Sequence, residues 1–208
     1  TRPRADGKHG RGIWVEAGAV VTLTGGAIVG NRTSAVTVAG VDTKVSLTNT
    51  VISGTAAQQS DNKGGRGLVV SDGAALKLTD VQILSSFTSG IACYDAGVVE
   101  LTGVVIAGTK VEPASGGEGY GLLVAGGAVS ARGVLAKANT TIGVYVTGTT
   151  SDVTLEGVVI QETAVDAKGS GVGLVVESGA KVTGNALHVH GSVEYGVLVS
   201  GTTSKFTS

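Results

Sequence analysis

The sequence lacks several residue types on which other fold classes depend. Its 208 residues include no methionine, 2 prolines and only 3% aromatic residues, whereas 35 residues are glycine. The long residues that favour helices are scarce, while valine and threonine are abundant, a balance typical of strands joined by tight turns. The composition therefore predicts an all-β fold.

The cysteine and charge content exclude further classes. The single cysteine, Cys93, cannot form an internal disulfide, so core packing and strand hydrogen bonds must stabilise the fold. The formal net charge of -1 provides no basic surface of the kind that attracts nucleic acid or an anionic membrane. No apolar run approaches the roughly 18 residues of a membrane span. We therefore expect neither a nucleic-acid partner nor a membrane span.

The chain does contain a repeat. Similar segments begin at Gly12, Ala35, Gly67, Gly90, Gly121, Gly143, Gly173 and Gly196. Self-similarity at a period of roughly 20 to 30 residues is typical of a solenoid. Because each segment stacks on the next, residues 1–208 are expected to form one domain.

Each repeat has room for three short strands, seen for example at 68–70, 76–78 and 81–83. The middle residue of the second strand is polar, as the alternation of a strand with one face in water requires. These residues are Thr22, Ser46, Lys77, Glu100, Thr154 and Thr183. No hairpin dipeptide recurs at regular spacing, which favours a parallel coil over an antiparallel meander. The pattern predicts a parallel β-helix of about seven to eight coils.

One polar residue follows the third strand of each repeat. These residues are Asn31, Thr55, Ser86, Thr109, Asn139, Thr163 and Ser192. Side chains of this kind satisfy the backbone groups of a turn, so we interpret the set as a structural ladder of stacked turns. Asn31 and Asn139 also begin glycosylation sequons, but their position in the ladder favours the turn role.

Long loops follow every second coil, at 56–66, 110–120 and 164–172. Residues 6–12 match 61–67, so 1–11 are expected to be the end of another such loop, and 196–208 an incomplete last coil of a longer array. With coils about 4.8 Å apart, the loops would recur about every 9.6 Å along one edge. Such edges commonly bind ligands. The candidate residues are Asp61, Asn62, Lys63, Glu112, Glu118, Tyr120, Asp166 and Lys168.

The outward positions of two strands are apolar where polar residues are expected. The outer column of the first strand also contains Thr37 and Ala92, and its large members are binding candidates: Trp14, Val69, Leu123, Tyr145, Val175 and Leu198. The third strand has a similar column, formed by Ala27, Val51, Gln82, Val105, Leu135, Val159 and His188. Either the long loops fold back over these columns, or the columns form an exposed patch used for association. The sequence leaves both alternatives open.

Side chains arranged for catalysis are scarce. Lys77 and Glu100 have opposite charges on neighbouring coils, which indicates a cross-strand ion pair rather than an acid and a base. His188 and His190 share a strand, but no third ligand completes a metal site with them. Cys93 falls in an inward position, where a buried, inert thiol is expected. We therefore expect no catalytic residues, no metal and no cofactor.

Coils of the form GRGIxVxxGAxVxLxxxxIxxNxxxxVxVxG, joined by loops such as DNKGGRG, resemble the right-handed β-helix repeats of large secreted or surface proteins of myxobacteria, within the pectate-lyase-like superfamily. The resemblance covers essentially the whole chain and implies right-handed coils and an extracellular or cell-surface location. The catalytic motifs of pectate lyases and polygalacturonases have no matching positions here.

The resemblance and the residue patterns together favour a non-catalytic structural or interaction module. It would associate with itself, laterally or end to end, or bind a cell-surface glycan or protein. The alternative is a polysaccharide-binding or polysaccharide-cleaving β-helix that uses the loop acids.

Overall fold

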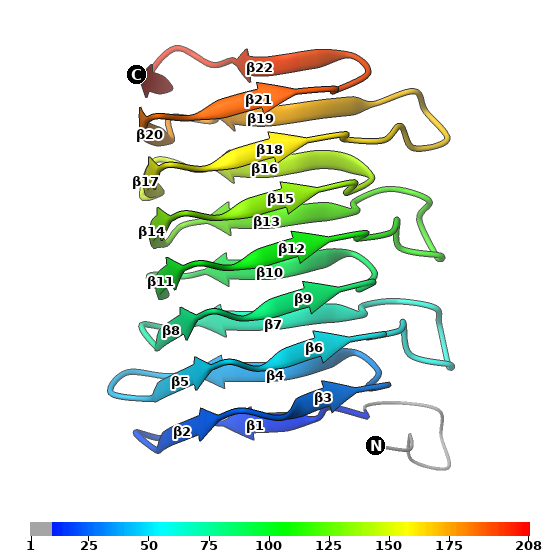
Figure 1. Cartoon of the computed structure of the whole chain (residues 1–208), viewed down its shortest axis with the longest axis vertical. Helices are drawn as coiled ribbons and strands as arrows, with labels where there is room; N and C mark the ends of the chain where they lie inside the picture. The colour runs from blue at the N-terminus through cyan, green and yellow to red at the C-terminus, as the bar shows by residue number, and fades with distance from the viewer. Residues whose placement is uncertain (1–9) are drawn as a thin grey trace.

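The computed structural model describes residues 10–208, and all the regular elements in this range are β-strands. The chain winds into a coil of three strands per turn that repeats along one axis and gives a rod (Figure 1). The predicted parallel β-helix is confirmed, since each strand pairs in parallel with the equivalent strand of the next coil. The expected loop at 1–11 lies almost entirely outside the described residues.

The strands form three sheets that run the length of the rod. Sheet 1 contains β1 (Ile13–Val15), β4 (Ser34–Ala39), β7 (Arg66–Ser71), β10 (Ser89–Tyr94), β13 (Tyr120–Ala125), β16 (Thr141–Thr147), β19 (Gly171–Glu177) and β22 (Tyr195–Val199). Sheet 2 contains β2 (Val20–Thr24), β5 (Lys44–Thr48), β8 (Ala75–Thr79), β11 (Val98–Thr102), β14 (Ala128–Arg132), β17 (Asp152–Glu156), β20 (Lys181–Asn185) and β23 (Lys205–Thr207). Sheet 3 contains β3 (Ala27–Val29), β6 (Val51–Ser53), β9 (Gln82–Leu84), β12 (Val105–Ala107), β15 (Leu135–Lys137), β18 (Val159–Gln161) and β21 (His188–His190).

The strand positions differ from the sequence expectation in two places. The third strands begin one residue later, so that β9 covers Gln82–Leu84 rather than 81–83. The sequence pattern also gave no second strand in the fifth coil, where the structure has β14. The inward residues of β14 are Val129 and Ala131, and the small Ala131 weakens the apolar alternation that identifies the other second strands.

The core is a stack of aliphatic side chains in which each coil repeats the residue of its neighbour. In sheet 2, Leu47, Leu78 and Leu101 pair in register, and all are 1% exposed or less. Burying one such side chain contributes about 1.5–3 kcal/mol. Where sheet 1 approaches sheet 3, the backbone leaves no room for a side chain, because a Cβ at Gly143 would lie 2.4 Å from Cγ2 of Ile160. The recurring glycine is therefore needed for packing.

The long loops leave the coil between sheet 3 and sheet 1 and project sideways from that edge (Figure 1). The backbone N–H of Gly64 donates to Oε1 of Glu112 at 2.9 Å, and the N–H of Ala114 donates to the carbonyl oxygen of Asn62 at 3.2 Å. The loops at 56–66 and 110–120 thereby contact each other across the turn at 85–88, which joins β9 to β10 and hydrogen-bonds both loops. They flank the faces of sheets 1 and 3 rather than folding back over them.

Candidate functional site

The aromatic residues of the chain gather on the outer face of sheet 1. This face carries the single tryptophan and all four tyrosines, which are Trp14, Tyr94, Tyr120, Tyr145 and Tyr195. We call it the tyrosine face. The residues that alternate with these aromatic residues along the strands point into the core. On β10, for example, Ile91 and Cys93 are fully buried. A chain with so few aromatic residues thus presents most of them on one side of the rod.

The outer column of the first strand forms a continuous row on this face. Trp14 pairs with Thr37, and the register continues through Val69, Ala92, Leu123, Tyr145, Val175 and Leu198. The row is unevenly exposed. Trp14 is 48% exposed, whereas Leu123 is 8% and Val175 only 4% exposed. The aliphatic members Leu123 and Val175 are therefore buried beneath neighbouring side chains, whereas Trp14 is open to solvent.

Tyr120 and Tyr145 come from neighbouring coils and meet edge to face, with ring centroids 5.1 Å apart and an angle of 65° between the rings. This geometry is favourable for an aromatic pair. The two rings line an open groove of about 210 Å³, which we call the tyrosine groove. Its other lining residues are Ile142, Ser170, Val172, Val175, Glu177, Glu194 and Leu198.

Hydrogen bonds fix the acidic side of the groove. The hydroxyl of Tyr145 donates to Oε1 of Glu177 at 2.5 Å, and the hydroxyl of Ser170 lies 3.5 Å from Oε2 of Glu194. Burial, followed by the bond to Glu177, raises the pKa of Tyr145 to about 12. The phenol therefore remains a protonated donor at neutral pH and orients the carboxylate beside it.

A second polar group lies at the loop side of the tyrosine face. Nη2 of Arg66 is 3.9 Å from Oε2 of Glu118, and the charge of Arg66 opposes the rise that burial causes in the pKa of Tyr94. Burial raises the pKa of Glu118, and the nearby guanidinium opposes that shift. The positive charge of Arg66 is therefore balanced within the chain by Glu118.

The tryptophan is held at one end of the face. Its Nε1 donates to Oε2 of Glu16 at 2.7 Å, and the guanidinium of Arg11 lies 3.8 Å from the centroid of the ring. A cation over an aromatic face is attracted by the quadrupole of the ring. The ring of Trp14 is thus oriented before any ligand arrives.

The acidic residues of the loops have partners inside the chain. Oδ1 of Asp61 accepts from the backbone N–H of Lys63, and Oδ1 of Asp166 accepts from that of Lys168. The Lys63 bond is the main cause of a lowered pKa at Asp61. Both aspartates thus shape the same turn in different loops. Glu112 connects two loops through Gly64, while Asn62, Lys63 and Lys168 are exposed.

The ladder residues lie in the interior of the turns rather than on the surface. Asn31, Thr55, Ser86, Thr109, Asn139 and Thr163 are at most 3% exposed, and Ser192 is partly exposed. Successive backbone bonds stack them, as where the N–H of Ala164 donates to the carbonyl oxygen of Asn139. Because Asn139 is buried, its side chain is not accessible to a glycosyltransferase in the folded chain.

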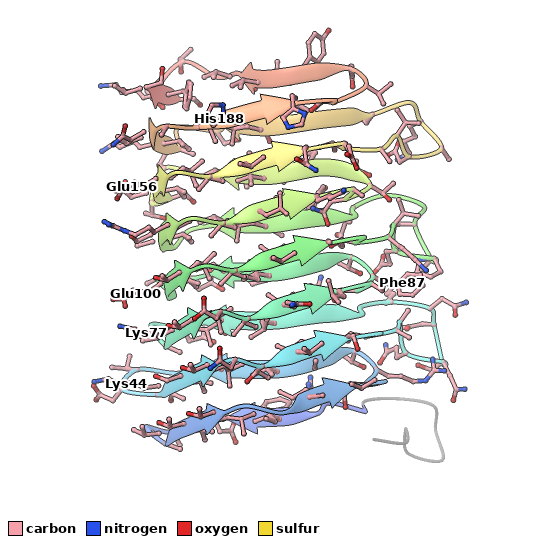
Figure 2. The ribbon with its side chains drawn as sticks, in the orientation of Figure 1. Lys44, Lys77, Phe87, Glu100, Glu156 and His188 are labelled. Atoms are coloured by element: carbon pink, nitrogen blue, oxygen red, sulfur yellow. The ribbon has the colours of Figure 1, made fainter. Side chains whose placement is uncertain are left out.

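The outer face of sheet 2 carries ion pairs. Nζ of Lys77 lies 3.3 Å from Oε2 of Glu100 on the next strand, and Figure 2 shows both at the edge formed by sheet 2. The cross-strand pair suggested by the sequence is therefore present. Arg132 and Glu156 form another pair at 2.7 Å. Exposed pairs of this kind contribute little to stability, at about 0–1 kcal/mol.

The outer column of the third strand lies on sheet 3. It runs in register from Ala27 through Val51, Gln82, Val105, Leu135 and Val159 to His188. His188 and His190 are both exposed on β21. Within residues 10–208, no three His, Cys, Asp or Glu side chains are grouped so that they could hold a metal ion.

The sequence did not reveal the tyrosine groove. The sequence pattern places Tyr120 at the loop edge and Tyr145 in the outer column, and it gives no reason to group Glu177 or Glu194 with them. The groove joins residues from different positions of the first strand. Tyr120 pairs with Ile142, which lies three residues before Tyr145 on the same strand. Aligning all positions of the first strand, rather than its middle residue alone, would have brought the groove residues together.

Comparison with known proteins identifies one family. The family described as right handed beta helix region matches residues 4–160 and 61–208, so the two matches together cover nearly the whole chain. No curated protein and no solved structure matches it. In the described part of the chain, no helix is long and apolar enough to cross a membrane.

Proposed function

This chain belongs to the right-handed β-helix family, and from that premise we propose that it is a non-catalytic binding module whose tyrosine face holds an extended polysaccharide. The observation that carries the proposal is the placement of the tryptophan and all four tyrosines on the outer face of one sheet. An extracellular or cell-surface location is part of the proposal, since such polymers are found there.

The aromatic residues suit a long ligand because they follow the axis of the rod. Trp14 lies on the first strand of sheet 1 and Tyr195 on the last, with the other three between them. At about 4.8 Å per coil, the face extends over roughly 34 Å. A sugar ring has apolar C–H faces and a polar rim, so it can stack on a tyrosine or tryptophan and hydrogen-bond with the surrounding polar groups.

The loop acids favour a binding role over a cleaving role. Asp61 and Asp166 each accept two or more hydrogen bonds from their own loop, and Glu118 is paired with Arg66. A catalytic acid or base must reach the substrate proton that it transfers. The two aspartates instead hold the turns of their own loops, and the charge of Glu118 faces that of Arg66.

Titration calorimetry against a panel of soluble oligosaccharides tests the proposal. Trp14 and Tyr195 are 48% and 51% exposed, so Trp14→Ala with Tyr195→Ala should leave the coil folded. We expect this double variant to lose at least about tenfold in affinity for any oligosaccharide that the chain binds. The control is Thr22→Ala with Thr154→Ala on the outer face of sheet 2. Unchanged affinity in the tyrosine-face variant would refute the proposal.

A second candidate function is self-association through sheet 3. Val51, Val105, Leu135 and Val159 are partly exposed and stand in one register on its outer face. Light scattering after size exclusion, over a hundredfold range of concentration, measures the solution mass. A mass that grows with concentration, and that falls in Val105→Thr with Leu135→Thr, would support association. A constant monomer mass would remove this candidate.

A further inference from the structure

We propose that the tyrosine groove binds a positively charged sugar unit, so that the polysaccharide held on the tyrosine face carries amino groups. This inference rests on the polysaccharide binding proposed above and names the class of polymer. It is argued from the size of the groove, its charge, its hydrogen bonds and its place in the row of aromatic residues.

The groove has the size and surface of a site for one ring. Its volume of about 210 Å³ is smaller than the roughly 300–1,000 Å³ of a site for a drug-sized ligand. Its apolar residues are Ile142, Val172, Val175 and Leu198, while Tyr120 and Tyr145 present their rings. One face of a pyranose ring can contact this surface while the rest of the polymer continues along the rod.

The charge of the groove selects the ligand. Its lining residues include two carboxylates, Glu177 and Glu194, and no basic side chain. The surroundings have the same sign: besides burial, the nearby Glu118, Glu177 and Asp166 raise the pKa of Tyr120. The two carboxylates would repel an anionic sugar. A neutral sugar would remove water from the carboxylates without supplying a positive charge to pair with them. An ammonium group supplies that partner.

The geometry gives an ammonium group several favourable contacts. Tyr145 holds Glu177 through one oxygen, and an ionised carboxylate can accept further hydrogen bonds. A bond from an ammonium N–H to a carboxylate is charge-assisted and therefore stronger than a neutral one. The ring faces of Tyr120 and Tyr145 add attraction for a cation within about 6 Å.

The row of aromatic residues favours an amino sugar polymer over a lysine-bearing peptide. The strand position of Tyr120 continues through Ile142 and Val172 to the exposed Tyr195, so a second aromatic side chain lies beyond the groove on the same column. A chain of rigid rings can use both places at once. A lysine side chain would use the groove alone and leave the outer tyrosine without a contact.

The test compares three hexamers with the same linkage: β-1,4-linked glucosamine, its fully N-acetylated form and β-1,4-linked glucose. Titration at about pH 5.5 keeps the free amines protonated. We expect the glucosamine hexamer to bind at least tenfold more tightly than the other two. Glu177→Gln and Glu194→Gln should each remove most of that preference. Glu100→Gln, on sheet 2, is the matched control and should change nothing.

The outcomes separate this inference from the proposed function. Equal affinity for the three hexamers, with no effect of Glu177→Gln, would overturn the charge selection and leave polysaccharide binding standing. Failure of every hexamer and polysaccharide to bind would overturn both. Tighter binding of a lysine-rich peptide than of the glucosamine hexamer, lost in Glu177→Gln, would overturn the assignment to a sugar. The glutamine at 177 can still accept the bond from Tyr145, so loss of folding is not expected.

Discussion

Asn139 joins its own coil to the preceding one through both ends of its side-chain amide. Its Oδ1 accepts from the backbone N–H of Thr109 at 3.1 Å, and its Nδ2 donates to the carbonyl oxygen of Ile106 at 3.1 Å. One coil further, Thr163 is equally buried at the same place in the turn, but its hydroxyl has no hydrogen-bond partner. Two side chains in equivalent positions therefore have opposite energetic roles.

This contrast predicts opposite effects of two substitutions. Asn139→Ala removes the partner of two buried backbone groups and should lower the free energy of unfolding by about 1–3 kcal/mol. Thr163→Val replaces an unpaired buried hydroxyl by a methyl group and should be neutral or stabilising. Urea unfolding followed by circular dichroism measures both. An equal loss in the two variants would contradict the distinction.

The outer column of the first strand should separate into covered and exposed members. Leu123 is 8% exposed, so Leu123→Ser should destabilise the chain by about 2–3 kcal/mol through lost packing and a buried hydroxyl. Trp14 is 48% exposed, and Trp14→Ser should change the stability by less than about 1 kcal/mol. Thermal unfolding of the two variants checks the difference. A large destabilisation by Trp14→Ser would mean that the column is covered along its whole length.

The thiol of Cys93 should be unreactive until the chain unfolds. Burial raises its pKa to about 12 from 9.0, and Sγ lies 3.3 Å from the carbonyl oxygen of Gly97. Only the thiolate is nucleophilic, so labelling with iodoacetamide at about pH 8.5 should be slow in buffer and rapid in denaturant. Rapid labelling of the native chain would show that the interior opens near Cys93.

The same pKa shift gives a direction for stability at alkaline pH. The unfolded chain loses the Cys93 proton first, above about pH 9, whereas the folded chain keeps it until about pH 12. The contribution of this thiol to stability is therefore fully present below pH 9 and declines between these two values. Cys93→Ala should flatten the decline in a series of unfolding curves from about pH 8 to 11. An unchanged slope in this variant would exclude the thiol as its cause.

Close packing predicts a severe effect at Gly143. A Cβ there would lie 2.4 Å from Ile160 and 2.7 Å from the carbonyl oxygen of Gly173, so Gly143→Ala requires the backbone to move. We expect a loss of at least about 2 kcal/mol. Gly117→Ala is the matched control, because its nearest neighbour would be the Ser115 hydroxyl at 3.8 Å. Equal melting temperatures in the two variants would show that the coil can widen at little cost.

The sequence predicted the coil well because each position repeats. The alternation around Leu78 and Leu101 marks the same inward direction in every coil, and the structure places these residues in register. Because equivalent strands of successive coils pair in register, a repeated strand in the sequence becomes one sheet of the structure. That is why the number of coils and the three strands in each could be predicted without any long-range information.

The tyrosine groove escaped prediction for the opposite reason. Tyr120, Tyr145 and Glu177 occupy three different positions of the repeat, so no single column contains them. Contacts between loops are likewise invisible in the repeat, since Gly64 and Glu112 lie in loops with unrelated sequences. Contacts between residues at non-equivalent positions of the repeat are therefore visible only in the folded structure.

The contact between these two loops also has a mechanical meaning. Stacked coils pulled along the rod are in series and all carry the same tension, so the weakest junction separates first. The bonds from Gly64 to Glu112 and from Ala114 to Asn62 run past the turn that joins β9 to β10, and they bear load in parallel with the junctions on either side of it. Tension on the rod would therefore separate coils outside this braced segment first, and the part of the tyrosine face that carries Tyr94 would be the last to lose its shape.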